Sequence, residues 1–596
     1  MPKKTPSINY TSRDFNSIKD DLVEYAKRYY PDTYRDFTEP SFGSLVMDSV
    51  AYVGDILSFY VDYQANESFL STAIEYDNIV KLSNQLGYKY QPNASSFGTL
   101  HMFALIPIES NTIAPDTNYM PILRKGSKFT SLANSMYTLI EDVDFSKAGN
   151  EIVVAQVDAT SGAPTAYAVR AAGTVMSGEL MVKQITIGAF EKFLRVKVPG
   201  QNISEIVSIT DDNGNVYYEV DYLSQNIIHV PVANNGENRA TVPNILKAIS
   251  VQRRFVVERD QSGTYLQFGY GSEESPVRLE EPSNIILDLH GKDYSTDKSF
   301  DPSVLGQTNK LGVTPSNTTL TVIFRVNTSA SANAAARTLV NVFNAVVNFD
   351  SPEALTTAKK NFVINSLEVI NEEAIVGDVS LPTSDELKQR AYSSFATQNR
   401  AVTKQDYISM IYRMPAKFGS VKRAALIQDR DSFNQRNLNI YVVSEDTNGD
   451  LVASNSVLKT NLKSWVEQYK MINDTVDILD TKIVNIGIDF VAVAASGVNK
   501  NDALTAATNS LRLYYVNQFD IGEPIMITDI YRILNGTTLI TDTVSVKVVV
   551  KSGTNYSDNG FDALRATSAD GRMVTPSSDM IFEIKDFFKD ITGTIR

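Results

Sequence analysis

The period of the hydrophobic residues changes along the chain, and this change restricts the possible folds more than any other feature. In residues 11–86 apolar side chains recur at steps of three and four, the period of an amphipathic helix. From residue 98 to about 330 they alternate along short runs separated by turn residues, as in half-buried strands. The 596 residues therefore need several cores, and length alone predicts about four domains.

Three helices are expected at the N-terminal end, over residues 11–30, 41–65 and 67–86. Pro31 follows the first helix and cannot continue it. Gly87 is expected to end the third, because glycine readily takes the left-handed conformation found at helix C-termini. The second helix would be about 37 Å long at 1.5 Å per residue.

The middle of the chain is expected to be mostly β. Residues 206–220 and 255–268 each contain two alternating runs around a polar turn, which predicts two hairpins. The turns are Asp211–Gly214 in the first and Asp260–Gly263 in the second.

Helices and strands alternate after residue 380. Thr383 and Glu386 have the spacing of a capping box, in which two side chains satisfy free amides at a helix N-terminus. Residues 438–548 continue in an α+β pattern, and a strand at 544–548 could complete its sheet. Residues 551–596, rich in Ser, Asp and Gly, are expected to form a mostly extended arm.

The expected fold class is therefore multidomain α+β, with long N-terminal helices, a β-rich middle and α+β C-terminal domains. The stretch 271–318, rich in Ser, Pro, Asn and Gly, favours long connections, so the boundaries within 271–380 are not fixed. The expected domains are a helical region at 1–97, a β-rich middle at 98–330, a helical or α+β region at 331–436, an α+β domain at 437–550 and the arm at 551–596.

Residues for redox, metal or nucleophilic chemistry are scarce. The chain has no cysteine, which excludes disulfides, iron–sulfur clusters and thiolate zinc sites. The three histidines have no partner at a metal-ligand spacing and are expected to be structural. They are His101, His229 and His290.

The sequence holds no HExxH, GxSxG, P-loop or EF-hand motif. Two segments resemble a glycine-rich loop and a calcium-binding loop without matching their spacing, and these near-miss motifs are expected to be turns. These are Gly269–Gly271 and Asp446–Asp450. We therefore expect no enzyme activity, no metal and no cofactor. A glycosidase pair of carboxylates stays open, because such residues meet in space rather than along the chain.

The overall charge limits the partners. With 55 basic and 69 acidic side chains the net charge is −14, which disfavours binding to nucleic acid or to an anionic membrane. The most apolar stretch, residues 45–61, contains Asp48 and Asp55 and is followed by Asp62, so no membrane span is expected. The N-terminus does not resemble a secretion signal. The partners are expected to be proteins.

Residues 41–80 contain six acids, no Lys or Arg, and many aromatic residues. Asp48, Asp55 and Asp62 are seven apart and therefore stay on one helical face. This face is either solvated or bound to a helical partner. The partner is the sharper interpretation, since the helix is too apolar to be covered by one layer. The residues expected to bind it are Leu45, Asp48, Tyr52, Asp55, Phe59, Asp62 and Phe69.

Residues 384–430 have the opposite charge, with nine basic and four acidic side chains. A nucleic-acid patch is the weaker interpretation. Aromatic residues are not interleaved with the Lys and Arg residues of this stretch, and the whole chain is acidic. Contact with a protein or plain solvation is favoured.

Two segments of this basic region resemble a known family. Leu381-Pro-Thr-Ser-Asp-Glu-Leu-Lys-Gln-Arg-Ala-Tyr and Gln398-Asn-Arg-Ala-Val-Thr-Lys-Gln-Asp-Tyr are similar to the hallmark of the baseplate J-like proteins of contractile phage tails. The hairpin at Tyr265-Leu-Gln-Phe-Gly-Tyr-Gly also resembles this family, although Tyr270 replaces the usual polar residue. Four N-terminal segments resemble the T4-like baseplate wedge proteins: Phe15-Asn-Ser-Ile-Lys, Asp48-Ser-Val-Ala-Tyr, Asn66-Glu-Ser-Phe-Leu and Leu86-Gly-Tyr.

The resemblance implies a non-enzymatic subunit of a tail baseplate that is made in the host cytoplasm and ends in the virion. It implies a homodimer within each wedge, a ring of wedges around the hub, and rearrangement when the tail contracts. Further implied partners are other wedge proteins at the N-terminal helices, and sheath-initiating and hub-proximal baseplate proteins. Neither nucleic acid nor a membrane is implied.

A scaffold motif is expected within the family-like segments, at Arg390, Arg400, Thr403, Asp406 and Tyr407. Thr403 is expected to cap a helix with Asp406 in its first turn, and Arg400 to reach nearby carbonyls or carboxylates. Two roles stay open for the motif, a local scaffold and an inter-subunit contact.

Two other classes of protein compete with this interpretation. A tail fibre or tailspike that binds or degrades polysaccharide would also be large, acidic and rich in β-structure, but it should show a repetitive β-solenoid pattern. A protein that handles nucleic acid would need a strong basic groove.

Overall fold

The computed structural model describes residues 13–30, 41–91, 94–109, 113–233, 244–260, 262–272, 311–328, 332–350, 352, 355–378, 381–429, 437–516 and 519–596. The chain forms two compact units. The smaller contains residues 1–88 and 382–395, and the larger contains residues 89–381 and 396–596. The histidine at position 290, most of the connection expected at 271–318 and Arg430 lie outside the described residues.

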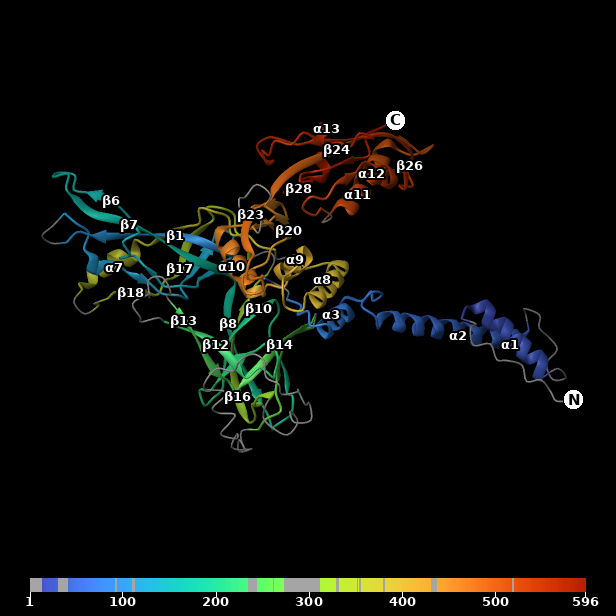
Figure 1. The fold of residues 1–596 in the computed structure, drawn as a ribbon, viewed down its shortest axis with the longest axis horizontal. Coiled ribbons are helices and arrows are strands. Elements are labelled where there is room, and N and C mark those ends of the chain that lie inside the picture. The colour runs from blue at the N-terminus through green and yellow to red at the C-terminus, as the bar shows by residue number, and fades with distance from the viewer. Residues whose placement is uncertain are drawn as a thin grey trace. The chain divides into compact units, whose positions relative to one another are not determined.

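The smaller unit is helical. Its first two helices, α1 (Phe15–Tyr29) and α2 (Phe42–Glu67), form an antiparallel pair (Figure 1). Asp14 caps α1 by accepting from the amide of Ser17, and Ser41 caps α2 by accepting from that of Ser44. The unit also contains α3 (Tyr76–Gln85) and residues 384–395 of α8 (Ser384–Thr397).

The third helix is shorter than its sequence pattern predicts. It begins at Tyr76 rather than near Glu67, because residues 68–75 form turns, and the carboxylate of Glu67 accepts from the amides of Ile74 and Glu75. Its predicted end is confirmed, since Gly87 has a φ of +86°.

The β-rich middle is confirmed, and most of its described strands belong to two seven-stranded sheets. The first has the order β17 (Leu339–Asn344), β3 (Lys128–Ser131), β4 (Met136–Leu139), β7 (Pro164–Ser177), β1 (Phe97–Pro107) and β19 (Glu368–Ile370), with β6 (Glu151–Val157) paired to β7. The second has the order β8 (Glu179–Ile187), β16 (Thr318–Val326), β10 (Ile203–Thr210), β11 (Val216–Glu219), β14 (Arg254–Asp260), β15 (Gly263–Phe268) and β9 (Arg195–Lys197).

Both predicted hairpins are present. β10 pairs antiparallel with β11 around a turn in which Gly214 has a φ of +77°, and β14 pairs antiparallel with β15 around Gly263. Smaller elements of this region are β2 (Ile122–Leu123), β5 (Val143–Asp144), β12 (Ile227–Ala233), β13 (Asn244–Ser250), β18 (Val347–Asn348), α7 (Thr357–Asn365) and the 3-10 turn Thr117–Tyr119.

The next part is α+β, as expected. β21 (Asn437–Glu445) pairs antiparallel with β20 (Arg423–Gln428) and parallel with β23 (Thr475–Asp480). The other elements are α9 (Lys404–Tyr412), the 3-10 turn Ala416–Phe418, β22 (Leu451–Val452) and α10 (Ser456–Val466).

The last part is built on β24 (Lys482–Ala494), which pairs antiparallel with β26 (Ile540–Val550) as the sequence pattern predicted. On its other side β24 pairs parallel with β28 (Met580–Glu583) and then β29 (Ile591–Ile595). The remaining elements are α11 (Lys500–Tyr515), β25 (Ile525–Met526), α12 (Ile527–Asn535), α13 (Ala563–Ala566), β27 (Met573–Val574) and α14 (Phe587–Asp590).

Residues 551–596 therefore differ from the extended arm that their composition suggested. Phe582, Ile584 and Ile591 are buried in the same cluster as residues of β24 and α11, because β28 and β29 pair with β24 and bring these apolar side chains into its core. The prediction rested on the high content of Ser, Asp and Gly in residues 551–596, and it overlooked the short apolar runs between them.

Four hydrophobic clusters form the cores of the larger unit, two in the β-rich middle and two in the α+β parts. In the α1–α2 pair the buried residues are few: Ala26 in α1, and Ser44, Ala51 and Glu67 in α2. The helical pair thus buries little apolar surface of its own.

Candidate partner-binding site

The contact between α1 and α2 uses the small and acidic residues of α2. The Nζ of Lys19 lies 2.7 Å from Oδ1 of Asp48, and Nη1 of Arg13 lies 2.9 Å from Oδ1 of Asp62. Between these ion pairs Gly54 lies against Ile18, so closely that a Cβ at position 54 would be 3.2 Å from its Cδ1. The acidic face predicted for α2 is therefore turned toward α1 at two of its three positions.

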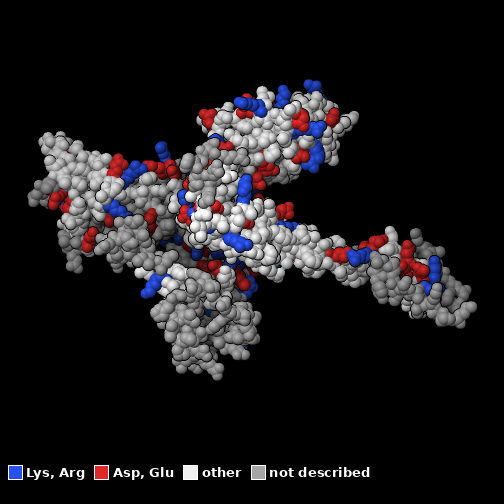
Figure 2. All heavy atoms as spheres, viewed as in Figure 1, with Lys and Arg blue, Asp and Glu red and all other residues white. Residues whose placement is uncertain are grey.

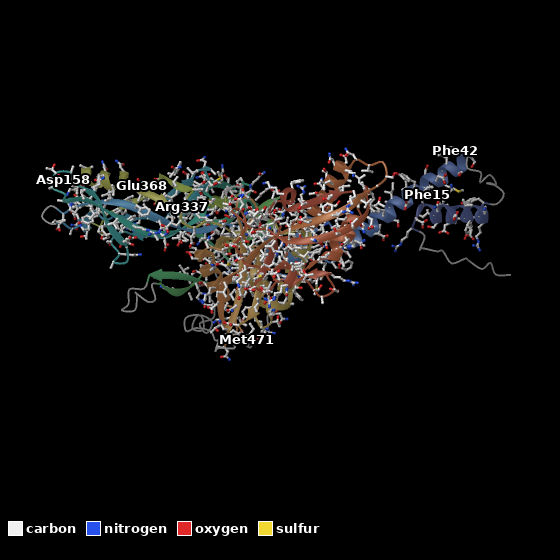
Figure 3. The ribbon with its side chains drawn as sticks, turned by 90° about the horizontal axis from the view of Figure 1, so that it is seen from above. Phe15, Phe42, Asp158, Arg337, Glu368 and Met471 are labelled. Atoms are coloured by element: carbon white, nitrogen blue, oxygen red, sulfur yellow. The ribbon has the colours of Figure 1, made fainter. Side chains whose placement is uncertain are left out.

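The apolar residues of α2 point away from this contact. Leu45, Tyr52 and Phe59 are 60–64% exposed, and Phe69 just after the helix is 65% exposed. Phe42, the first residue of α2, is 81% exposed (Figure 3). We call the following set the α2 apolar surface: Phe42, Leu45, Val46, Val50, Tyr52, Val53, Leu57, Phe59, Tyr60, Val61 and Phe69.

The seven residues predicted to bind a helical partner thus fall into two groups. Leu45, Tyr52, Phe59 and Phe69 belong to the α2 apolar surface, whereas Asp48 and Asp62 are ion-paired to α1. Asp55 is half-buried between them on the same helical face. Figure 2 shows charged side chains of both signs on the α1–α2 part of the molecule.

By length and composition α2 also passes the test for a membrane-spanning helix. An 18-residue stretch within it has a mean hydropathy of 1.3, and 11% of that stretch is buried. Asp48, Asp55 and Asp62 all lie on this helix, and a carboxylate in hydrocarbon is costly. Its exposure shows that the helix is not a core helix of the described structure.

A buried carboxylate that the sequence analysis did not single out holds the end of α2. Glu67 is 4% exposed, and its Oε1 accepts from the amide of Ile74 at 2.7 Å while its Oε2 accepts from Nδ2 of Asn78 at 2.9 Å. These hydrogen bonds, first that of Asn78 and then that of Ile74, lower the pKa of the Glu67 carboxyl below its usual value. Glu67 therefore fixes the turn that connects α2 to α3.

The family-like turn before α9 has an unusual backbone. Gln398 and Asn399 both have positive φ, at 48° and 61°, and Nη1 of Arg413 donates to Oδ1 of Asn399 at 2.8 Å. The amide of Ala401 then donates to the carbonyl of Tyr469 at 2.9 Å. The side chain of Arg413, which follows α9, and the backbone of Tyr469, which follows α10, thus hold this turn in place.

The cap predicted at Thr403 is confirmed as a full capping box. Oγ1 of Thr403 accepts from the amide of Asp406 at 3.2 Å, and Oδ2 of Asp406 accepts from the amide of Thr403 at 2.8 Å. One turn later the buried Tyr407 donates from its hydroxyl to Oδ2 of Asp474 at 2.6 Å. Burial and this carboxylate raise the pKa of the Tyr407 hydroxyl.

The two arginines of the predicted scaffold motif differ from these residues. Arg390 lies on α8 in the smaller unit, with Nη2 4.0 Å from Oε2 of Glu386. Arg400 has an exposed side chain, and its amide donates to the carbonyl of Thr397 at 3.1 Å. Within the motif, Thr403 and Asp406 cap α9 and Tyr407 binds Asp474, whereas the side chain of Arg400 faces solvent.

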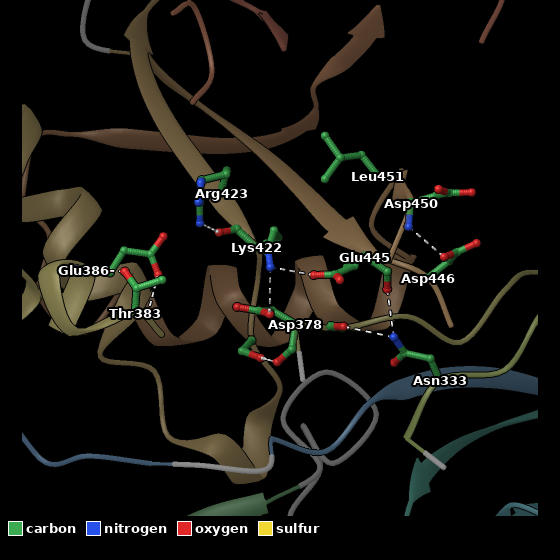
Figure 4. Close-up of polar contacts among 12 residues, drawn as sticks. Asn333, Asp378, Thr383, Glu386, Lys422, Arg423, Glu445, Asp446, Asp450 and Leu451 are labelled. Carbon is green, nitrogen blue, oxygen red and sulfur yellow. Dashed lines mark hydrogen bonds and ion pairs between the residues drawn. The ribbon is translucent and has the colours of Figure 1, made fainter. Parts of the chain in front are cut away.

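The larger unit also contains a buried group of polar contacts around Asn333 that the sequence did not predict (Figure 4). We call it the polar junction. Nδ2 of Asn333 donates to the carbonyls of Glu445 at 2.8 Å and Gly377 at 3.1 Å, and Oγ of Ser96 donates to its Oδ1 at 2.5 Å. The junction joins segments more than 300 residues apart, which no local sequence signal could show. Residues 384–430 contain nine basic residues. Two of them, Lys422 and Arg423, are only 8% exposed and therefore add little charge to the surface.

One of the histidines and one of the near-miss motifs have structural contacts within the described residues. His101 lies between Arg170 and Glu372, with Nε2 3.4 Å from Oε2 of Glu372. Oδ1 of Asp446 accepts from the amides of Asn448 and Asp450, so Asp446–Asp450 is a turn as expected. Among the described residues no group of three or more His, Asp or Glu could hold a metal ion.

Comparison with known proteins gives a family match at the N-terminal end. Residues 14–85 match the family described as bacteriophage baseplate protein, N-terminal domain. No curated protein matches the chain. A solved structure titled cryo-EM structure of the anti-feeding prophage (AFP) baseplate, 6-fold symmetrised, aligns over 96% of this chain and 99% of its own at 9% identity. Its TM-score of 0.28 is too low to show a shared fold.

The matched residues contain both helices of the α1–α2 pair, the Glu67 turn and all of α3. The part of this chain that carries the α2 apolar surface is therefore similar to the N-terminal domain of bacteriophage baseplate proteins.

Proposed function

We propose that this chain is a structural subunit of a contractile phage-tail baseplate wedge, that it joins wedges into a ring around the hub, and that it rearranges during tail contraction. The observation that carries the proposal is the α2 apolar surface, which lies within the residues similar to a baseplate domain. In this proposal the chain is not an enzyme, is made in the host cytoplasm and resides in the tail baseplate of the virion.

The α2 apolar surface supports assembly through helices. Burying apolar area contributes roughly 25 cal/mol per Å², whereas a contiguous exposed patch of this kind marks an interaction site or favours aggregation. Because Asp48 and Asp62 are already paired with α1, the surface offered to a partner is mostly apolar and aromatic. It suits the apolar face of another long helix, from a second copy or from another wedge protein.

The larger unit is proposed to provide the other contacts. The α+β domain at 437–550 would dimerise or form the ring, and further surfaces would meet sheath-initiating and hub-proximal proteins. In support, β26 pairs with β24 on one side only among the described strands, and Val544 on β26 is 50% exposed. The exposed Arg400 beside the rigid Thr403 cap is proposed to contact a carboxylate of a neighbouring subunit.

Immunogold electron microscopy of intact particles tests the proposal. Antibodies raised against the larger unit should label the baseplate end of the tail at sites related by six-fold symmetry. Labelling confined to fibres or to the capsid, or no labelling of the particle, would contradict the proposed function.

A further inference from the structure

A buried lysine lies between two carboxylates where three extended segments of the larger unit run side by side (Figure 4). The amide of Asp378 donates to the carbonyl of Ser420 at 3.1 Å, and that of Lys422 donates to the carbonyl of Val443 at 2.9 Å. Nζ of Lys422 lies 2.7 Å from Oε2 of Glu445 and 3.9 Å from Oδ1 of Asp378. The three side chains are 11%, 19% and 9% exposed.

This arrangement places one cation against two anions away from water. Burying ionised groups costs several kcal/mol each, and the two carboxylates share this ammonium. The neighbouring cation, Arg423, has its Nε 2.8 Å from Oδ1 of Asp520. Condensation of the ammonium with one carboxylate would reduce the three buried ionised groups to one, the other carboxylate.

We propose that Lys422 and Asp378 condense to form an intramolecular amide bond, with Glu445 transferring the protons. Glu445 takes one proton from the ammonium, and the neutral Nζ attacks Cγ of Asp378. A bond forms between Nζ and Cγ, a Cγ–O bond breaks, and the leaving oxygen departs as water with the protons lost from nitrogen. One ammonium and one carboxylate thus become one amide and one water, with no oxidant, reductant or other reactant.

The geometry assigns a separate role to each carboxylate. Glu445 is at hydrogen-bond distance from Nζ, as a proton acceptor must be. Asp378 is the more buried of the two, with its Oδ1 3.9 Å from Nζ, and Nζ has to move toward Cγ until these two reacting atoms are about 3–3.5 Å apart. The long lysine side chain can make this shift by rotation of its terminal bonds. Fixing both reactants in a site that excludes water supplies the effective concentration that free groups in solution lack.

The bond would close a covalent loop from residue 378 to residue 422. This loop contains residues 382–395, the segment that belongs to the smaller unit. A cross-link of this kind restricts the unfolded chain, as a disulfide does, although the chain has no cysteine. It would hold the two ends of that segment together even when the larger unit is loaded or denatured.

Mass spectrometry of the denatured full-length chain tests the proposal. The intact mass should be lower than the sequence mass by one water, and digestion should yield a branched peptide that joins the segments around Asp378 and Lys422. K422R keeps the charge but not the nucleophile, and E445Q removes the proton acceptor, so both variants should have the full sequence mass. K459R is the matched control, because Lys459 is also ion-paired, with Nζ 2.6 Å from Asp480, and it should keep the loss of water.

Two results would overturn the proposal. One is a wild-type chain with the full sequence mass after prolonged incubation in the folded state. The other is a loss of water that fragmentation assigns to any other position. Neither readout of the wild-type chain depends on whether a variant folds.

Discussion

Nζ of Lys19 and Oδ1 of Asp48 lie 2.7 Å apart, and this pair joins α1 to the face of α2 that carries its acids. The relationship decides which side of α2 is available. Because the acidic face is turned toward α1 at Asp48 and Asp62, the exposed remainder of the helix is the α2 apolar surface.

The Lys19–Asp48 pair should stabilise the helical pair measurably. In a double-mutant cycle with K19M and D48N, we expect a coupling energy of about 0.5–1 kcal/mol that falls as salt is added, because the pair is half-exposed. The measurement is the opening free energy of α1 amides by hydrogen exchange in the full chain. Arg13 and Asp62 are more exposed, so their cycle should give a smaller value, and an equal or larger one would contradict this ranking.

Replacement of Glu67 should loosen the turn between α2 and α3. E67A leaves the amides of Ile74 and Glu75 without their carboxylate acceptor, so limited proteolysis should cut within residues 68–75 faster than in the wild type. The matched control is E75A, since the carboxylate of Glu75 accepts from the Tyr63 hydroxyl rather than from an amide of the turn. Equal cleavage rates for E67A and the wild type would show that Glu67 does not hold the turn.

The same carboxylate predicts a loss of order in acid. The pKa of Glu67 is lowered in the folded chain, so its stabilising effect is present above the usual pKa of 4.5 and is lost as the pH falls through the lowered value. Cleavage in residues 68–75 by an acid-active protease should therefore rise as the pH falls below 4.5 in the wild type and change less in E67Q. Identical pH profiles would contradict this.

Much of the local structure could be predicted, because it depends on neighbouring residues. The capping boxes at Thr383 and Thr403, the turn glycine Gly263 and the strand at 544–548 each carry their signal within a few positions. The exposed apolar residues of α2 were also predicted from their number and from the lack of basic residues around them.

The remaining features could not be predicted, because they depend on tertiary contacts that no local sequence pattern indicates. The start of α3 was missed because the carboxylate of Glu67 competes for the amides of residues 74 and 75. The partners of the acids on α2 were missed because Lys19 and Arg13 come from a different helix. The packing of residues 551–596 depends on parallel pairing with β24, about one hundred residues earlier in the chain.

The capping box of α9 should contribute about 1 kcal/mol. T403A removes the acceptor for the amide of Asp406, whereas T403S keeps a hydroxyl and serves as the control. The measurement is the opening free energy of α9 amides by hydrogen exchange. Equal protection in T403A and T403S would show that the cap does not stabilise this helix.

The C-terminal part should lose stability as the pH rises toward neutrality. Burial raises the pKa of Glu583 from 4.5 to about 7, against the stabilising hydrogen bonds from the amide of Leu451 and Nδ2 of Asn485. A raised pKa means stability that is present below 4.5 and lost as the pH rises through about 7, and this rise corresponds to roughly 3 kcal/mol. The pKa of Asp450 is raised by burial as well, which adds to the effect in the same direction.

Thermal unfolding of this part between pH 5 and 8 measures the effect. The wild type should unfold at a lower temperature at pH 8 than at pH 5.5, and E583Q should show a flatter profile because it cannot ionise. Asp570 is exposed and accepts from Oγ of Ser568, so D570N is the control and should keep the wild-type profile. A wild-type profile as flat as that of E583Q would contradict the role of Glu583.

The central claim is that the α2 apolar surface is an assembly surface, and the molar mass of the full-length chain in solution tests it most directly. Size-exclusion chromatography with light scattering at micromolar concentration should give at least twice the mass of one chain. The triple variant L45S/Y52S/F59S should give the mass of one chain, while F343S should behave as the wild type, since Phe343 and Phe59 are both 64% exposed but lie in different units. A wild-type chain that elutes as a stable, soluble monomer, or a triple variant that assembles like the wild type, would contradict the claim.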